Sequence, residues 1–262
     1  MDESIVKHAM ESGDAAIAEE AFRRLNVQIE STSDVGEIAT LYLGKATLHG
    51  VLGQFDDARR QLDLALQYAP DNEDIRLQHD FIGASLYDQE RKPGEAYSKL
   101  TSVLSDYSER LSRPDVRFMY EDIQLRRGFD ATSTGRFNDA LPILRECLLF
   151  ELKPTDKSIV LSDLGRCYSE AEEYESARDC LVQAICIGLT RESEGQAHLY
   201  LGIACARLGL FQDAKKEFLL CEERTAEYGL EIGKVYGWLS WICKGLGERS
   251  ESERYSKLAR PC

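Results

Sequence analysis

The sequence predicts an all-α protein, a right-handed α-solenoid of about seven antiparallel helix pairs. A short turn phrase recurs along the chain, and small residues recur at fixed distances before and after it. The 262 residues also exceed the usual length of one compact domain. A repeat array escapes that limit, because each repeat packs only against its neighbours.

The turn phrase marks where one helix ends and the next begins. It occupies residues 53–58, 135–140 and 209–214, each starting with Gly and ending with Ala, and residues 172–177 repeat it without the Gly. Glycine readily adopts the left-handed conformation that ends a helix, and Asp or Ser then favours a new helix start. Each phrase therefore predicts a helical hairpin.

Further residues keep constant distances from these turns. Leu164, Gly165 and Tyr168 precede one turn, and Leu201 and Gly202 hold the same places before the next. This pattern resembles the tetratricopeptide repeat (TPR) family. The resemblance implies small residues where the two helices of a pair approach closely. The matching positions hold Ala46, Ala84, Gly128, Gly165, Gly202 and Ser240 on the first helices, and Ala58, Ala96, Ala140, Ala177, Ala214 and Ser252 on the second.

The resemblance divides the chain into repeats of one TPR-like solenoid spanning residues 1–262. Residues 1–30 form a degenerate first pair, in which Gly13, Ala18 and Phe22 fit the pattern. The expected repeats are 39–72, 77–110, 121–154, 158–191, 195–228 and 233–262. Equivalent residues lie 37–44 positions apart, against the family's 34, so longer helices or turns are expected.

Some positions depart from the pattern. Lys45, Gly83 and Arg127 stand where the family has an apolar packing residue, which leaves the register of those first helices open. Arg91 replaces a turn glycine, and Pro93 replaces the aromatic residue that follows it.

Charge and cysteine usage limit the possible partners and location. The net charge of −14 would repel nucleic acid and anionic membrane surfaces, so neither is expected as a partner. No secretory signal or membrane-spanning segment is recognisable, which predicts a cytoplasmic protein. The eight cysteines include no CxxC pair, and most fall where a small core residue is needed, so reduced, buried thiols are expected.

Signatures of catalysis and cofactor binding are absent from the sequence. The four histidines are dispersed without zinc-ligand spacing, and His49 and His198 fall at packing positions. No phosphate-binding glycine loop and no nucleophile elbow occur. We therefore expect no enzyme, no cofactor and no metal.

The resemblance places a ligand on the concave face, which the first helix of each pair lines. The residues favoured for partner binding are Phe81, Arg126, Phe129, Arg166, Tyr200, Arg207, Trp238 and Trp241. The wider apolar lining is Ile82, Leu125, Ile159, Leu199 and Ile203, and the remaining charged lining is Lys234, Lys244, Asp88, Asp122, Asp163 and Glu170. Five basic and four acidic residues make this groove more positive than the chain as a whole. An acidic and hydrophobic peptide would complement it.

Several alternatives stay open. The two tryptophans could instead cover the core of the last repeat beneath Tyr255, and Leu199 and Ile203 could be packing residues. The main functional hypothesis is a protein- or peptide-binding adaptor; the alternative is a regulator that senses a peptide or ligand and changes the curvature of its superhelix. The Lys, Asn and Arg set with which some relatives grip a C-terminal carboxylate is not reproduced here. Self-association through the terminal repeats is also possible.

Overall fold

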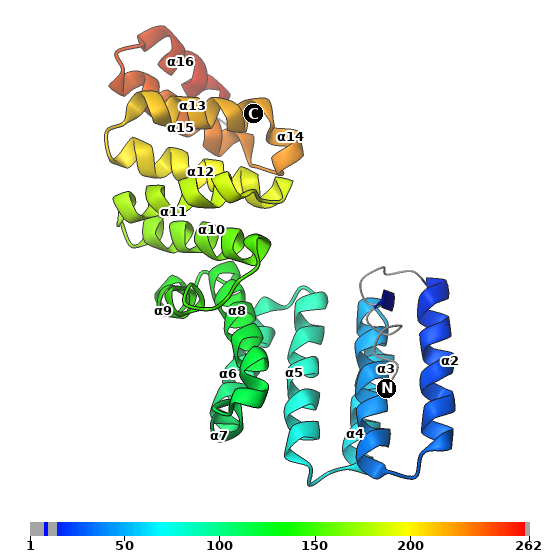
Figure 1. Cartoon of the computed structure of the whole chain (residues 1–262). Helices are drawn as coiled ribbons and strands as arrows, with labels where there is room; N and C mark the ends of the chain where they lie inside the picture. Colours follow the sequence, from blue (N-terminus) through cyan, green and yellow to red (C-terminus); the bar gives the residue numbers. More distant parts are fainter. Residues whose placement is uncertain (1–7, 10–14, 260–262) are drawn as a thin grey trace. The chain divides into compact units, whose positions relative to one another are not determined.

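The computed structural model describes residues 8–9 and 15–259, and every regular element in these residues is helical (Figure 1). The all-α prediction is therefore confirmed, whereas Gly13 lies outside the described residues. The elements are α2 (Ala15–Ser31), α3 (Val35–Val51), α4 (Phe55–Tyr68), α5 (Glu73–Gln89), α6 (Pro93–Asp106), α7 (Ser108–Leu111), η1 (Pro114–Val116), α8 (Arg117–Ser133), α9 (Phe137–Cys147), α10 (Pro154–Glu170), α11 (Tyr174–Ile187), α12 (Arg191–Arg207), α13 (Phe211–Glu223), α14 (Thr225–Tyr228), α15 (Ile232–Gly245) and α16 (Arg249–Leu258).

Residues in the left-handed conformation separate the two helices of the pairs from α3 to α16. Gly53 and Gly209 have φ angles of 72° and 76°, as the turn phrase predicts. Arg91 and Glu172 take the same conformation, with φ angles of 59° and 61°, although each carries a side chain. The turn therefore forms even where glycine is lost, and Pro93 follows as the first residue of α6, where its fixed φ suits a helix start.

Small residues allow the helices of a pair to approach closely. An added Cβ on Gly165 of α10 would collide with the side chain of Leu181 on α11. On Gly202 of α12, an added Cβ would lie 2.8 Å from the ring of Phe218 on α13. Within the described residues, five of the six predicted second-helix positions are fully buried alanines, and Ser252 is half-buried.

Longer first helices and one insertion explain the long repeats. Helices α3, α5, α8, α10 and α12 each contain 17 residues and begin four residues before the expected repeats. The widest spacing, between Ala96 and Ala140, also includes the short elements α7 and η1. Both explanations expected from the sequence therefore contribute.

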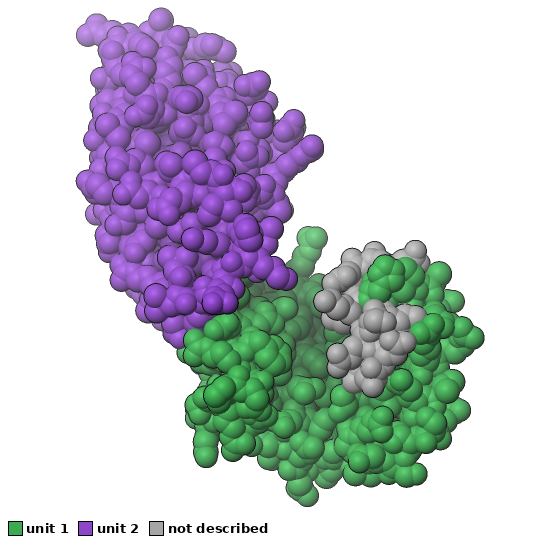
Figure 2. Space-filling model, viewed as in Figure 1, with its two compact units in different colours: residues 1–130 green, residues 131–262 purple. Residues whose placement is uncertain are grey.

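The chain divides into two compact units, residues 1–130 and residues 131–262 (Figure 2). In unit 1, separate apolar clusters gather around Leu25, Leu43 and Leu100. In unit 2, one cluster runs from Ala177 of α11 to Tyr255 of α16. The interpretation of residues 1–262 as one continuous solenoid stays a prediction.

The described cysteines carry free thiols, as expected, and five are buried. Cys147 and Cys221 replace alanine beneath their first helices and are fully buried. Cys186 differs from the expectation, because it lies exposed in the last turn of α11. No helix in the described part of the chain combines the length and apolar character that crossing a membrane requires.

Candidate functional site

A cavity of about 170 Å³ lies beside Arg166 on the first-helix side of unit 2. Its lining consists of Ile159, Ser162, Asp163, Arg166, Ser193, Gln196 and Tyr200. The Arg166 guanidinium lies between two rings, 5.2 Å from the centre of Phe137 and 5.7 Å from that of Tyr200. Stacking of this kind leaves the N–H groups in the guanidinium plane able to bind a carboxylate.

Arg166 lacks an acidic partner within the described residues. It forms no ion pair there, and its Nε is buried without a hydrogen-bond acceptor. Burial raises the pKa of the neighbouring Asp163 to about 7, although the Arg166 charge acts in the opposite direction. A large share of Asp163 is therefore protonated near neutral pH, so the carboxyl only partly neutralises the arginine.

A second cavity, of about 420 Å³, surrounds the two tryptophans of α15. Its lining consists of Arg207, Lys234, Gly237, Trp238 and Trp241. The Arg207 guanidinium lies 5.6 Å from the Trp238 ring centre, and the described residues offer it no ion pair. Trp241 meets Trp238 edge to face at 5.8 Å and remains 44% exposed. This cavity therefore combines the positive charge of Arg207 with the exposed aromatic surface of Trp241.

The alternative interpretation of the tryptophans is partly supported. Trp238 stacks on the buried Phe218 with ring centres 5.8 Å apart, so it contributes to the core. Tyr255 stacks on Tyr236 at 5.9 Å, and no ring contact joins it to either tryptophan in the part of the chain described. Leu199 and Ile203 also pack against the core of unit 2, as their alternative interpretation suggested.

In unit 1, the predicted arginine Arg126 forms ion pairs with acidic neighbours, which the described residues do not offer to Arg166 and Arg207 in unit 2. The Arg126 guanidinium lies 5.6 Å from the ring centre of Phe81, but it also binds Asp122 at 3.2 Å and approaches Asp88 at 3.6 Å. Phe129 lies half-buried, three residues further along α8. Acidic neighbours therefore already compensate the charge of Arg126.

Two carboxyl groups share a buried region beside this arginine. Burial and the neighbouring Asp88 carboxyl raise the pKa of Asp130 to about 8, and burial also raises the pKa of Asp88. The sequence indicated Asp88 as groove lining but gave no sign of its pairing with Asp130. The two residues are 42 positions apart, and only the packing of α5 against α8 relates them.

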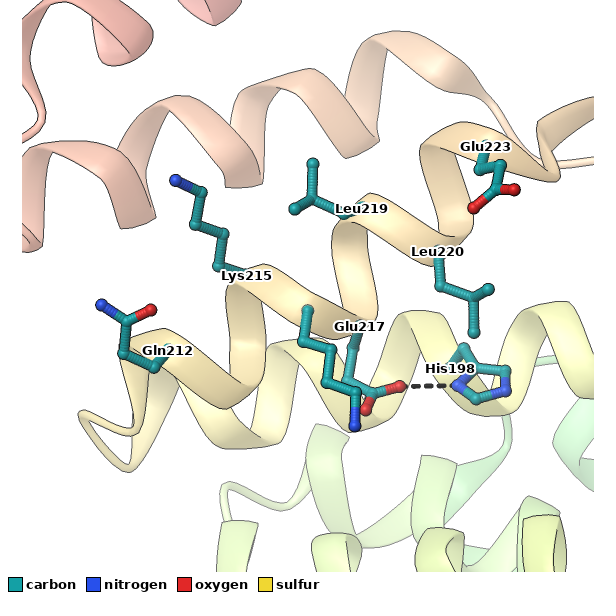
Figure 3. A pocket seen from close by; sticks show the side chains of 8 residues that line it. His198, Gln212, Lys215, Glu217, Leu219, Leu220 and Glu223 are labelled. Carbon is teal, nitrogen blue, oxygen red and sulfur yellow. Dashed lines mark hydrogen bonds and ion pairs between the residues drawn. The ribbon is translucent and has the colours of Figure 1, made fainter.

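A larger cavity, of about 710 Å³, lies along the second helix α13 (Figure 3). Here His198, Lys215 and Glu217 are already paired within the protein. His198 Nδ1 lies 2.6 Å from a carboxylate oxygen of Glu217, and Lys215 Nζ lies 2.6 Å from Glu248 and 2.7 Å from Glu251. The packing role predicted for His198 fits its 8% exposure.

The same lysine lies beside a cluster of potential metal ligands, Cys243, Glu248 and Glu251. Its ammonium group binds both carboxylates and so supplies the positive charge that a cation would bring. This cluster gives no support to a metal site.

Several solved structures share the fold of this chain, although their sequences differ widely from it. No protein-family model and no curated protein matches the chain. The apo form of RapI aligns with a TM-score of 0.67 and 12% identity, over 98% of this chain and 73% of RapI. The apo quorum sensor NprR from B. thuringiensis gives 0.57 and 15%, over 97% of this chain and 84% of NprR.

A third match carries the repeat in its description. The C-terminal part of a TPR repeat-containing protein from Cytophaga hutchinsonii aligns with a TM-score of 0.60 and 14% identity, over 97% of this chain and 92% of that protein. At these identities the likeness speaks for the fold, and it agrees with the turns and small residues described above. The resemblance to tetratricopeptide repeats that the sequence indicated is therefore confirmed, and the chain has the tetratricopeptide-repeat fold.

Proposed function

We propose that the chain is a non-catalytic adaptor that binds an acidic, hydrophobic segment of another protein on the first helices of unit 2. The observation that carries this proposal is that Arg166 and Arg207 form no ion pair among the described residues. Each lies on an aromatic ring beside its own cavity, and neither has an ion-pair partner among the described residues. A carboxylate from a partner would supply the missing acceptor.

The aromatic groups of the same face would supply affinity. Tyr200 lines the smaller cavity, and Trp241 exposes 44% of its surface at the larger one. Tyrosine, tryptophan and arginine are the residue types that most often dominate binding energy at protein interfaces. Phe81, Arg126 and Phe129 in unit 1 are a weaker candidate surface, because Arg126 already has acidic neighbours.

The test is a quantitative pull-down from host lysate with the wild type and the variant Arg166→Glu/Tyr200→Ala/Trp238→Ala. A variant of the opposite side of the repeats, Lys216→Glu/Leu219→Ala, is the matched control, since both residues are exposed on α13. We expect one protein to be enriched by the wild type and the control, and lost from the groove variant. Equal retention by all three folded baits would refute the site.

The second candidate is a sensor that changes conformation on binding a peptide or small ligand. It is favoured because one structure with the same fold is a quorum sensor. Small-angle scattering separates the two functions: a sensor changes its scattering profile on adding the ligand, whereas an adaptor with a preformed groove does not. Light scattering at high protein concentration tests the remaining hypothesis of self-association.

The cytoplasmic location belongs to the proposal. The free thiols of the described residues support it, since such an arrangement is typical of a reducing compartment. Fractionation of the host with an antibody to the chain would test it.

A further inference from the structure

Two of the departures from the repeat pattern in unit 1 meet at one place. The first is the insertion α7–η1, which makes this repeat the longest. The second is Arg127, which stands at an apolar packing position of the family. Together they line a cavity of about 460 Å³ that belongs to no predicted site. Its lining consists of Leu104, Ser108, Leu111, Ser112, Arg117, Tyr120, Gln124 and Arg127.

The charge of this cavity is unusual for its surroundings. Residues 1–130 contain 25 acidic and 15 basic side chains, yet the lining contains two arginines and no carboxylate. Arg117 lies at the rim, 59% exposed, and binds Glu121 at 2.8 Å. A small anion entering this cavity would meet the charge of Arg127, whereas Glu121 already compensates part of the charge of Arg117.

Arg127 is the inner of the two arginines. Its guanidinium lies 5.7 Å from the ring centre of Tyr97, and one terminal nitrogen donates to Gln124 Oε1 at 3.0 Å. Its Nε is buried without an acceptor, and it forms no ion pair within the described residues. An anion in the cavity would give the guanidinium a charged partner that the described residues do not provide.

Arg127 belongs to a row of polar residues on one face of α8. Arg117, Tyr120, Gln124 and Arg127 are three or four positions apart on α8, so their side chains lie on one face. Gln124 links two of these residues, because its Oε1 accepts from Arg127 and its Nε2 donates to Tyr120 Oη at 3.0 Å. Leu104 and the buried Leu111 add apolar surface to the lining.

The opposite wall is fixed by buried polar contacts. Arg110 of α7 is 8% exposed and binds Asp74 at 2.6 Å and Asp115 at 2.9 Å. Tyr107, just before α7, donates to Asp80 at 2.8 Å. These contacts attach the insertion to α5, so the cavity is preformed and a ligand need not order it.

We infer that this cavity binds a small organic oxyanion, with a phosphate or carboxylate group on Arg127 and an apolar body on Leu104 and Leu111. The volume lies within the range of about 300–1,000 Å³ that small-molecule sites occupy. Arg127 binds the oxyanion through its fork of N–H donors, and Arg117 strengthens the field from the rim. The inserted turns are thus the wall of a ligand site outside the groove proposed for the partner.

Calorimetric titration with phenyl phosphate, benzoate and inorganic phosphate tests this inference on the full chain. The two aryl probes carry an apolar ring, and they distinguish a phosphate from a carboxylate ligand. We expect at least one aryl probe to bind with a Kd of about 1 mM or tighter, and more tightly than inorganic phosphate. Absence of binding by both aryl probes overturns the inference, and equal binding of inorganic phosphate overturns the apolar part of the site.

Variants locate the binding. Arg127→Met places the apolar residue of the repeat pattern at this position, so it should fold, and we expect about tenfold or greater loss of affinity. Arg117→Met, at the exposed rim, should lose severalfold. Arg113→Met, outside the lining, and Arg166→Glu, in unit 2, should bind as the wild type does. Unchanged affinity in Arg127→Met and Arg117→Met would place the anion elsewhere and refute the assignment.

Discussion

The arginines predicted to line the groove have different surroundings in units 1 and 2. In unit 1, Arg126 lies on Phe81 but is surrounded by Asp122 and Asp88. In unit 2, Arg166 and Arg207 lie on aromatic rings without an ion pair among the described residues. The two units also differ in charge. Unit 1 contains 25 acidic and 15 basic residues, whereas unit 2 contains 21 acidic and 17 basic residues and is less negative.

The difference shows that a predicted groove position does not by itself leave an arginine without acidic neighbours. All three arginines were predicted to face the groove, each from a different position of the repeat. What separates them is whether the fold already supplies a carboxylate, and this depends on residues in neighbouring helices. An internally compensated arginine gains less from a partner's carboxylate, because an existing interaction must be given up.

The largest expected effect is on the stability of unit 2. Phe218→Ala removes a fully buried ring beneath Trp238, so we expect a loss of about 3–5 kcal/mol. Both tryptophans of the chain lie in unit 2, so their fluorescence reports its unfolding in urea, while circular dichroism reports all helices. A shift below about 1 kcal/mol in the fluorescence transition would contradict the packing described.

The second effect concerns the close approach of paired helices. Gly165→Ala should destabilise unit 2 by about 1–3 kcal/mol, because the new methyl group collides with Leu181. In unit 1 the equivalent Ala84 is fully buried, and Ala84→Gly should cost about 1 kcal/mol through lost helix propensity. Urea unfolding of both variants checks the pair. Stabilisation by Gly165→Ala would show that α10 and α11 have more space than the structure indicates.

The third effect is a gain in stability at the two turns that lack glycine. Arg91→Gly in unit 1 and Glu172→Gly in unit 2 relieve a left-handed conformation, and each should stabilise by about 0.5–1 kcal/mol. Gly53→Ala is the reverse experiment at an equivalent turn and should destabilise by a similar amount. Thermal unfolding would measure all three, and destabilisation by both glycine substitutions would contradict the turn assignment.

The fourth effect is on the pH dependence of stability. The raised pKa of Asp130, about 8, means that the folded state keeps a proton that the unfolded chain loses near pH 4. Stability should therefore fall as pH rises across this interval, and Asp130→Asn should flatten the fall. Asp163→Asn should act similarly in unit 2, over an interval ending near its pKa of about 7.

Urea midpoints measured by circular dichroism from pH 5 to pH 8 would test these slopes. Glu170→Gln, which alters an exposed carboxyl on α10, is the control and should leave the slope unchanged. An identical slope in the wild type and Asp130→Asn would mean that the carboxyl ionises normally in the folded state.

The fold was predictable from the sequence because its main determinants are local. Gly53 and Gly209 define turns, and Gly165 and Gly202 define close contacts, without reference to distant residues. The candidate site was predictable only in part. Phe137, the first residue of α9, lies on Arg166 of α10, and Asp88 and Asp130 meet across 42 positions, so neither relation follows from a repeat pattern. The cavity beside Arg127 depends on the inserted elements α7 and η1, which no turn phrase indicates.

The distribution of thiols in unit 2 gives a direct way to follow its motions. The buried cysteines Cys147, Cys167, Cys205, Cys221 and Cys243 place one thiol on each of α9, α10, α12, α13 and α15. A buried thiol reacts with an alkylating reagent only when its helix opens, and the exposed Cys186 gives the reference rate for open solvent. Pulsed alkylation read by peptide mass spectrometry would therefore map helix-by-helix opening in the unmodified protein, with and without a bound partner.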